Sequence, residues 1–143
     1  MDKNTVQLLK ECSSGCHMAM QSVKKMREYA KDSKLNDLLE AYGEKHRKLE
    51  GEIADQLKAC GERESEPSMM AEVMARTEMN MKMFMHPDDQ QVAKIMMDGC
   101  NMGIQTVSEY VNKYPDASRE SQSAAKQLIK IEEDFMQEMK GFM

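Results

Sequence analysis

The chain has 143 residues, of which 25 are acidic and 20 basic, so its formal net charge is −5. This length fits one domain of ordinary size, and the modest acidic excess argues against nucleic acid or an anionic membrane as the main partner. Seventeen Met residues, which pack well in cores, compensate for a shortage of other large apolar side chains, and only three Pro residues interrupt the sequence. The composition therefore predicts a single all-α domain spanning residues 1–143.

The sequence also predicts the cellular compartment of the protein. The first 14 residues contain no apolar run, so no secretory signal is expected. The longest uninterrupted aliphatic or Met run is three residues, Ile95–Met97, which is far too short to span a membrane. Cys12 and Cys16 would share one helical face with their Cβ atoms roughly 6 Å apart, beyond the usual reach of a disulfide. We therefore expect a cytoplasmic protein with reduced thiols.

The first two predicted helices cover about residues 3–31 and 34–60. In both, apolar residues recur every three or four positions, as in long amphipathic helices. Asp32 and Ser33 provide a cap for the second helix, and Gly61 provides its C-terminal stop. The predicted apolar seams are Val6, Leu9, Cys12 or Ser13, Cys16, Met20, Val23, Met26 and Ala30 in the first helix, and Leu35, Leu39, Tyr42, His46, Leu49, Ile53, Leu57 and Cys60 in the second.

Three further helices are predicted, at about residues 69–85, 89–113 and from 118 onward. Ser68 caps the first of these, residues 86–89 form a break rich in acids, and Pro115 ends the next helix. The predicted seams of the last two helices are Val92, Ile95 or Met96, Gly99, Met102, Thr106 and Tyr110, and then Ala125, Leu128, Ile131, Phe135, Met139 and Phe142.

Four of these helices have about 25 residues each, which corresponds to roughly 37 Å, and such matched lengths favour a four-helix bundle. Short connections make the first two and the last two helices antiparallel hairpins. The middle connection, about residues 61–88, contains a helix that covers roughly 25 Å, most of the bundle's length. We therefore predict an all-α four-helix bundle of two hairpins joined by a helical crossover, with the second and fourth helices parallel.

Several segments carry a resemblance to a known family. The stretches KECSSG, EKHRKLEGE, MDGCNMG and LIKIEE, together with the two-hairpin architecture, resemble the ferritin-like superfamily and especially its small bacterial bundle proteins. The resemblance covers nearly the whole chain and implies a ferritin-like bundle. In the metal-binding members, it implies two irons at the centre, held by a Glu from each of two helices and a Glu-x-x-His from each of the others.

The chain departs from that iron-binding pattern. The residue three positions before His46 is Gly43, the residue three positions after Glu132 is Phe135, and no Glu-x-x-His occurs anywhere. If the first hairpin turns near residue 32, His46 faces Met18 rather than a carboxylate. We therefore expect no complete di-iron centre.

A weaker set of candidate metal ligands is left. If the second hairpin turns near residue 115, Asp98 lies level with Glu132 and Glu133. A thiolate with imidazole suits zinc or copper better than iron. The structural alternative is that the cysteines pack as small hydrophobes, that the seam histidine makes an internal hydrogen bond and that the acids point outward. The candidate ligands are Cys16, His17 and His46 on one hairpin and Asp98, Cys100 and Glu132 on the other.

A second candidate lies in the Met-rich segment before His86. Met79, Met81, Met83 and Met85 alternate, and in an extended chain they would form a soft array suited to Cu(I). Because the flanking pattern is helical, we prefer an amphipathic helix that packs on the bundle. Its remaining Met side chains could then form an adaptable surface for a protein partner.

Gly99 and Gly103 lie four residues apart inside a predicted helix, where each costs about 1 kcal/mol relative to Ala. We predict that a neighbouring helix approaches closely there, with a dimer contact as the functional alternative.

These observations predict a cytoplasmic, non-catalytic ferritin-like bundle with a binding or assembly role, plausibly a homo-oligomer. No phosphate-binding loop or nucleophile–base spacing stands out, so no catalytic residue and no cofactor are expected. The alternative is a soft-metal protein that binds zinc or copper through Cys, His and Met. A ferritin-like iron-binding oxidoreductase is the third hypothesis.

Overall fold

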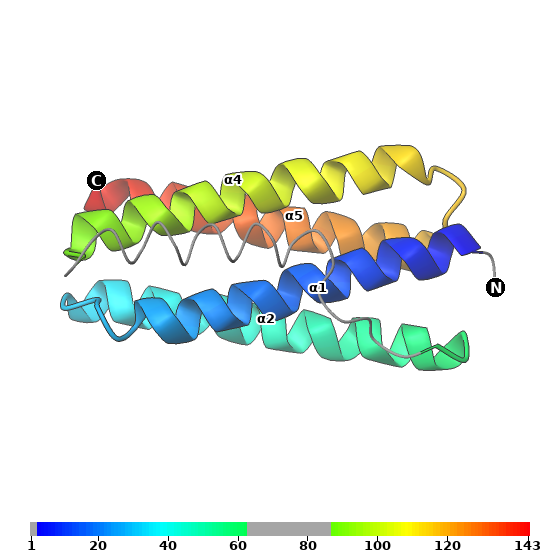
Figure 1. The fold of residues 1–143 in the computed structure, drawn as a ribbon, viewed down its shortest axis with the longest axis horizontal. Helices are drawn as coiled ribbons and strands as arrows, with labels where there is room; N and C mark the ends of the chain where they lie inside the picture. The colour runs from blue at the N-terminus through cyan, green and yellow to red at the C-terminus, as the bar shows by residue number, and fades with distance from the viewer. Residues whose placement is uncertain (1–2, 63–86) are drawn as a thin grey trace.

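The computed structural model describes residues 3–62 and 87–143, and within these ranges the chain is helical with no strand. The predicted all-α bundle is confirmed (Figure 1). The predicted helix at 69–85 and the Met-rich segment up to His86 lie outside the described residues. The helices are α1 (Lys3–Met26), α2 (Ser33–Ala59), α4 (Asp89–Lys113) and α5 (Arg119–Met139), followed by the short 3₁₀ helix η1 (Lys140–Phe142).

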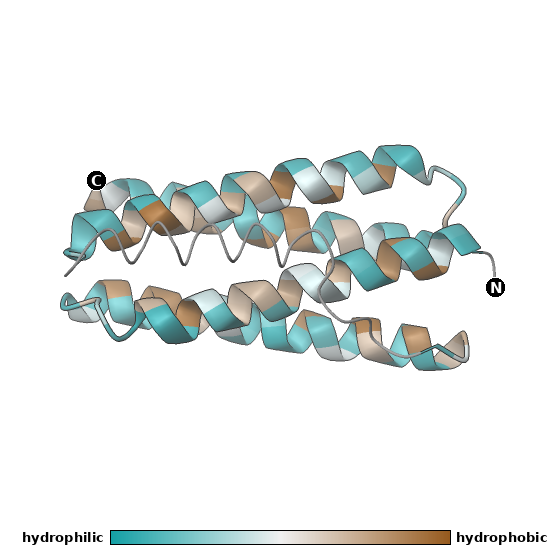
Figure 2. Ribbon diagram, viewed as in Figure 1, coloured by the Kyte–Doolittle hydropathy of each residue, from teal (hydrophilic) through white to brown (hydrophobic). Residues whose placement is uncertain are grey.

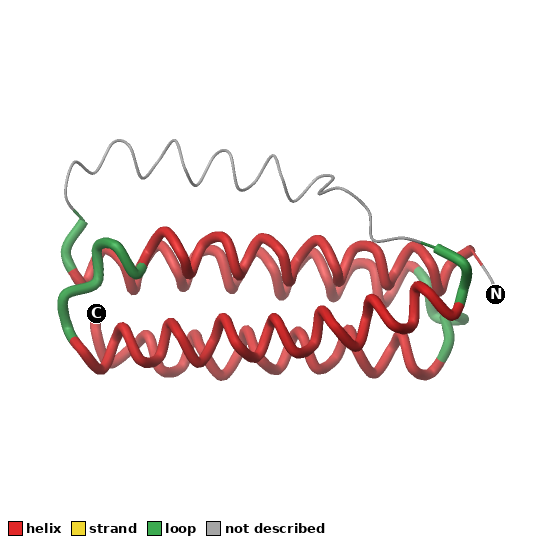
Figure 3. Tube along the Cα trace, turned by 90° about the horizontal axis from the view of Figure 1, so that it is seen from below, coloured by secondary structure: helices red, strands yellow, loops and turns green. Residues whose placement is uncertain are grey.

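The four long helices form two antiparallel hairpins, α1–α2 and α4–α5 (Figure 1). One layer contains α1 and α4, and the other contains α2 and α5; Figure 3 shows the same layers from below. Because α2 ends and α4 begins at opposite ends of the bundle, these two helices run parallel, as predicted. No helix among the described residues is long and apolar enough to cross a bilayer.

Side chains at the N-termini fix where three of the helices begin. Asp32, Asp88 and Ser118 each accept a hydrogen bond from the backbone N–H three residues later. Gln91 completes a capping box by accepting a hydrogen bond from the Asp88 N–H. These bonds satisfy backbone donors that have no partner within the helix.

Gly61 ends α2 as predicted. Its φ is +74°, a left-handed conformation that glycine adopts without steric cost. The N–H of Gly61 donates to the Lys58 carbonyl and the N–H of Glu62 donates to the Leu57 carbonyl, both at 2.9 Å. This pair of bonds is a Schellman motif, which satisfies carbonyls of the last helical turn.

Apolar and polar residues are interspersed along all four long helices (Figure 2), and the buried apolar ones form two core clusters, one toward each end of the bundle. The seam predicted for α2 is buried along its length, except that Cys60 is half-buried. Large side chains of the first cluster are Met26, Leu35, Leu39, Phe135 and Met139, and those of the second are Leu8, Leu9, Leu49, Ile53, Leu57 and Leu128.

Hydrogen bonds also connect the two hairpins at both ends of the bundle. At one end the Asp89 carboxylate accepts from the backbone N–H groups of Lys31 and Asp32, at 2.7 and 3.1 Å. At the other end the Thr5 hydroxyl accepts from the Ser118 N–H at 2.8 Å. The start of α4 is thereby fixed against the α1–α2 turn, and the start of α1 against the α4–α5 turn.

Two details of the predicted helices were wrong. The first helix ends at Met26 instead of continuing to residue 31, because the N–H groups of Glu28 and Tyr29 bond only three residues back and the Asn36 side chain donates to the Ala30 carbonyl. On α4, Cys100 and Val107 are buried whereas Gly99 and Met102 are exposed. The predicted seam of α4 therefore lies partly beside its true buried face.

Candidate functional site

Four polar or polarisable side chains meet in the middle of the bundle, between the two core clusters. Tyr42 and His46 come from successive turns of α2, Cys100 comes from α4, and Glu132 comes from α5. His46 is 0% exposed and Glu132 is 5% exposed. Because buried charges and polar groups are costly unless they are paired, their partners decide what this cluster does.

Glu132 is bonded through both of its carboxylate oxygens. The Tyr42 hydroxyl donates to Oε2 at 2.7 Å, and Nε2 of His46 lies 2.5 Å from Oε1. The Tyr42 oxygen also lies 3.5 Å from Sγ of Cys100. The cluster thus links three helices, and its strongest bonds join α2 to α5, which belong to different hairpins.

The hydrogen-bond geometry shows which nitrogen of His46 must carry a hydrogen. Its Nδ1 lies 2.8 Å from the backbone carbonyl oxygen of Tyr42, and a carbonyl only accepts, so Nδ1 carries a hydrogen. Two bare acceptors would repel at the distance between Nε2 and Glu132, so one proton lies between them. Whether that proton is on the imidazole or on the carboxyl group, the pair has no net charge.

Aromatic packing and burial keep the rest of the cluster fixed and neutral. The Tyr42 ring stacks on Phe135 with centroids 4.0 Å apart, and its centroid lies 4.2 Å from that of His46. Burial, followed by the nearby Glu132, raises the pKa of Tyr42 and of the Cys100 thiol well above their usual values. Both groups therefore stay protonated near pH 7.

A cavity of about 70 Å³ lies next to this cluster, between α1 and α4. Tyr42 and Glu132 line it, whereas His46 does not. Gly99 and Met102, which also line it, are exposed, so the cavity extends from the surface toward the buried carboxyl group.

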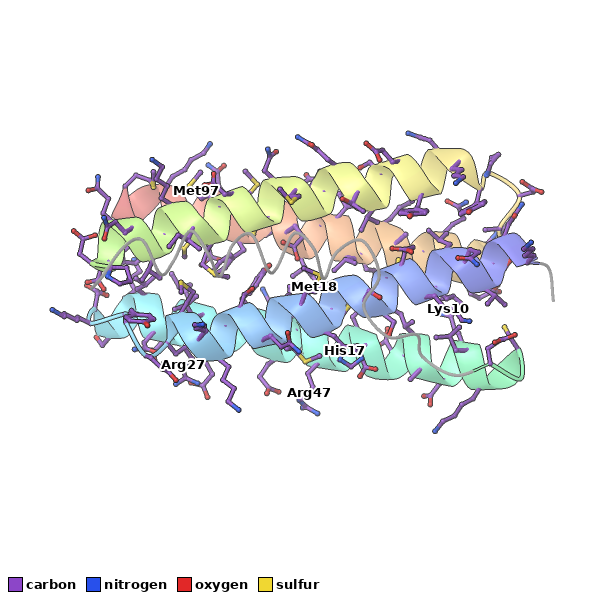
Figure 4. The ribbon with its side chains drawn as sticks, in the orientation of Figure 1. Lys10, His17, Met18, Arg27, Arg47 and Met97 are labelled. Atoms are coloured by element: carbon purple, nitrogen blue, oxygen red, sulfur yellow. The ribbon has the colours of Figure 1, made fainter. Side chains whose placement is uncertain are left out.

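The cavity walls are rich in sulfur. Met18 lies on the side of α1 that faces α4 (Figure 4), and Met96, Met102 and Cys100 line the cavity from α4. Met18 and Met96 are buried, and Met102 is 40% exposed. The cavity thus presents a carboxyl group and a phenol at its inner end, with thioethers and a thiol around it.

The two glycines of α4 border this cavity and do not mark a close helix contact. A Cβ built on Gly99 would meet none of the described atoms within 4 Å, and the nearest atoms to one on Gly103 belong to the Glu132 side chain, at 3.8 Å, an ordinary van der Waals distance. The predicted close approach of a neighbouring helix was therefore wrong for the described helices. Instead, the missing side chains leave space along α4 in front of Glu132.

The six predicted metal ligands do not gather in one place. His46 and Glu132 bond directly, and Cys100 joins them through Tyr42. The others are separate: Cys16 is buried in the core cluster around Leu8 and Leu57, His17 is half-buried with Nε2 3.4 Å from Glu50, and Asp98 is exposed. Across residues 3–62 and 87–143, no three His, Cys, Asp or Glu side chains are grouped to hold a metal.

Sequence reasoning did not single out the residues that complete the site. Tyr42 was recognised only as a seam residue, although its position one turn before His46 places both on one face of α2. Met18 was predicted to lie opposite His46, but its place on a cavity wall depends on how the hairpins pack. No pattern in the sequence indicates that Met96 and Met102 share this cavity.

Comparisons with known proteins agree with this fold. Residues 4–113, well over half of the chain, match the family model described as "Domain of unknown function (DUF2383)". Among solved structures, the chain is similar to a crystal structure of a DUF305 fragment from Deinococcus radiodurans, with a TM-score of 0.74 at 14% identity over 98% of this chain and 95% of that one. At this identity the likeness concerns the fold alone. No curated protein matches the chain. The chain belongs to the DUF2383 family.

Proposed function

We propose that this protein is a non-catalytic, cytoplasmic binding protein with a ferritin-like bundle that lacks a di-iron centre. A site of the ferritin type takes four Glu and two His side chains. Among the described residues, Glu132 is the only buried acidic residue and His46 the only buried histidine. Because these two groups satisfy each other, the centre of the bundle holds the hairpins together instead of holding iron.

The same bonds argue against acid–base or nucleophilic catalysis. Both nitrogens of His46 are engaged, one by a carbonyl and one by Glu132. The thiol of Cys100 is a poor nucleophile because burial raises its pKa. The cluster therefore supports a structural role, and the neighbouring cavity is where a ligand would bind.

The observation that carries the binding role is the cavity that extends from exposed Gly99 to buried Glu132. Its volume of about 70 Å³ is small, which favours an ion or a molecule of a few atoms. Since small ligands gain at most about 1.5 kcal/mol per non-hydrogen atom, a neutral four-atom molecule would bind no more tightly than tens of micromolar. An ion with matched donors is the better occupant.

Anaerobic loading with Fe(II), followed by exposure to oxygen, tests the non-catalytic part of this proposal. The expected result is no stoichiometric iron and no turnover. Two irons per chain with repeated oxygen consumption would contradict it and would support the oxidoreductase hypothesis.

A second candidate function is the zinc or copper binding predicted from the sequence, in which the directly bonded His46 and Glu132 would supply two of the ligands. It would require the metal to displace the proton between His46 and Glu132. Metal analysis of protein purified without a His tag tests it, and a Cys16→Ser/His46→Ala variant examines the hairpin site predicted from sequence. Metal content that is unchanged in this variant would rule that hairpin site out.

We also propose the assembly roles predicted from the sequence, a homo-oligomer and a protein partner at the Met-rich segment. Light scattering on the purified chain tests the first. A monomer at all accessible concentrations would exclude it.

A further inference from the structure

The sulfur atoms around the cavity point to a specific class of ligand, and this inference rests on the proposed binding role of the cavity. Two helices contribute sulfur side chains to the same walls: Met18 from α1, and Met96, Cys100 and Met102 from α4. Met96 and Cys100 are one helical turn apart, so their side chains lie on one face of α4. Thioethers are thus concentrated in a cavity whose lining also includes the Glu132 carboxyl group.

We propose that the cavity binds one soft monovalent metal ion, Cu(I) or Ag(I), through the thioethers of Met18 and Met96. Met102 stands at the exposed outer rim, where it is placed to receive the ion before it reaches the two buried thioethers. The Cys100 thiol is a further neutral sulfur donor on the same wall.

The partners of the other polar groups leave sulfur as the donor available to a ligand. His46 does not line the cavity, and both of its nitrogens are bonded elsewhere. Each Glu132 oxygen already takes part in one hydrogen bond, Oε2 with Tyr42 and Oε1 with His46. Sulfur ligands select soft ions such as Cu(I), whereas zinc usually needs thiolates or imidazoles.

The charge arrangement favours a single positive charge. Within the neutral His46–Glu132 pair, Glu132 lines the cavity whereas His46 does not. A cation in the cavity therefore meets the acidic end of the pair. Because burying charge is costly, a monovalent ion fits this low-charge site better than a divalent one.

Access to the site is provided along α4. No described atom lies within 4 Å of a Cβ placed on Gly99, and the three atoms nearest to one placed on Gly103 all belong to Glu132. The cavity lining includes both the exposed Gly99 and the buried Met18 and Met96.

The test uses the full chain, with Ag(I) as an air-stable probe and Cu(I) in anaerobic competition with a chromophoric chelator. Met79, Met81, Met83 and Met85 are first replaced by Leu, because their thioethers would otherwise compete. In this background we expect one ion per chain by native mass spectrometry and shifted ¹³C ε-methyl resonances of Met18 and Met96.

Variants then locate the site. Met18→Leu/Met96→Leu should weaken Cu(I) binding at least tenfold, and Met136→Leu, which is partly buried but does not line the cavity, should leave it unchanged. Met→Leu nearly conserves volume, so both variants should fold, as circular dichroism will show. Equal affinity in the two variants, or methyl shifts confined to other Met residues, would overturn the proposal.

Pressurised xenon separates this proposal from the proposed function, because xenon enters accessible apolar cavities without needing metal ligands. If xenon shifts the Met18 and Met96 methyl resonances but Ag(I) does not bind, the soft-metal proposal fails and the accessible cavity survives. If neither probe affects these resonances, the proposed binding role fails as well.

Discussion

Replacing Tyr42 with Phe tests whether the central cluster stabilises the bundle. The change removes the hydroxyl that donates to Glu132 at 2.7 Å and keeps the ring that stacks on Phe135. Without this donor a buried carboxyl oxygen loses its partner, which costs about 1–3 kcal/mol, so we expect the free energy of unfolding to fall by about 2 kcal/mol. For a chain of this size that is a decrease in Tm of roughly 4–8 °C.

Urea unfolding followed by circular dichroism measures this loss of stability. The slope of the free energy of unfolding against urea concentration should not change. Tyr114→Phe is a matched control, because Tyr114 also stacks on another ring but is only half-buried, and it should cost less than about 0.5 kcal/mol. In a Glu132→Gln background the effect of Tyr42→Phe should shrink by about 1 kcal/mol, since the two groups share one bond. A loss as small as that of the control, or full additivity with Glu132→Gln, would refute the reasoning.

Three other predictions follow from the fold. Asp89→Ala leaves the two backbone N–H groups of the α1–α2 turn without their acceptor and should cost about 1 kcal/mol in urea unfolding, whereas Asp89→Asn should cost less. Burial, followed by Glu11, raises the pKa of Cys12 from 9.0 to about 12, so the folded thiol stays neutral while the unfolded one ionises above pH 9. The stability that the neutral thiol contributes is fully present below pH 9, and the free energy of unfolding should be lower by about 1.4 kcal/mol at pH 10. Between pH 8 and pH 10, the free energy of unfolding of Cys12→Ala should therefore fall by less than that of the parent protein. Gly99→Ala should stabilise the protein by about 0.5–1 kcal/mol, because a Cβ there meets no atom of the described residues within 4 Å, and a destabilised variant would show that something packs against it.

The sequence predicted some parts of the fold better than others, for physical reasons. Regular apolar spacing located the buried face of α2, and the caps at Asp32, Gly61 and Ser118 are local signals that the structure confirms. Spacing was less successful for α4, where Gly99 and Met102 line a cavity instead of the core. Periodicity shows which side of a helix is apolar but not what covers each part of that side.

The candidate site was also predictable from the sequence only in part. Spacing singled out His46 and Glu132 and correctly showed that no Glu-x-x-His accompanies them. Their direct bond depends on the distance between two hairpins, which no local pattern specifies. Asp98 was placed at the level of Glu132 by counting along the hairpin, but it is exposed, because equal height in a bundle does not make a residue point inward.

The central claim is that His46 and Glu132 satisfy each other and leave no ligands for iron, and ¹⁵N NMR of the imidazole during anaerobic Fe(II) titration tests it most directly. We predict that Nδ1 is protonated, that Nε2 is hydrogen-bonded to Glu132, and that neither signal changes as Fe(II) is added. Loss of the His46 signals through paramagnetic broadening, with two equivalents of iron bound per chain, would contradict the account.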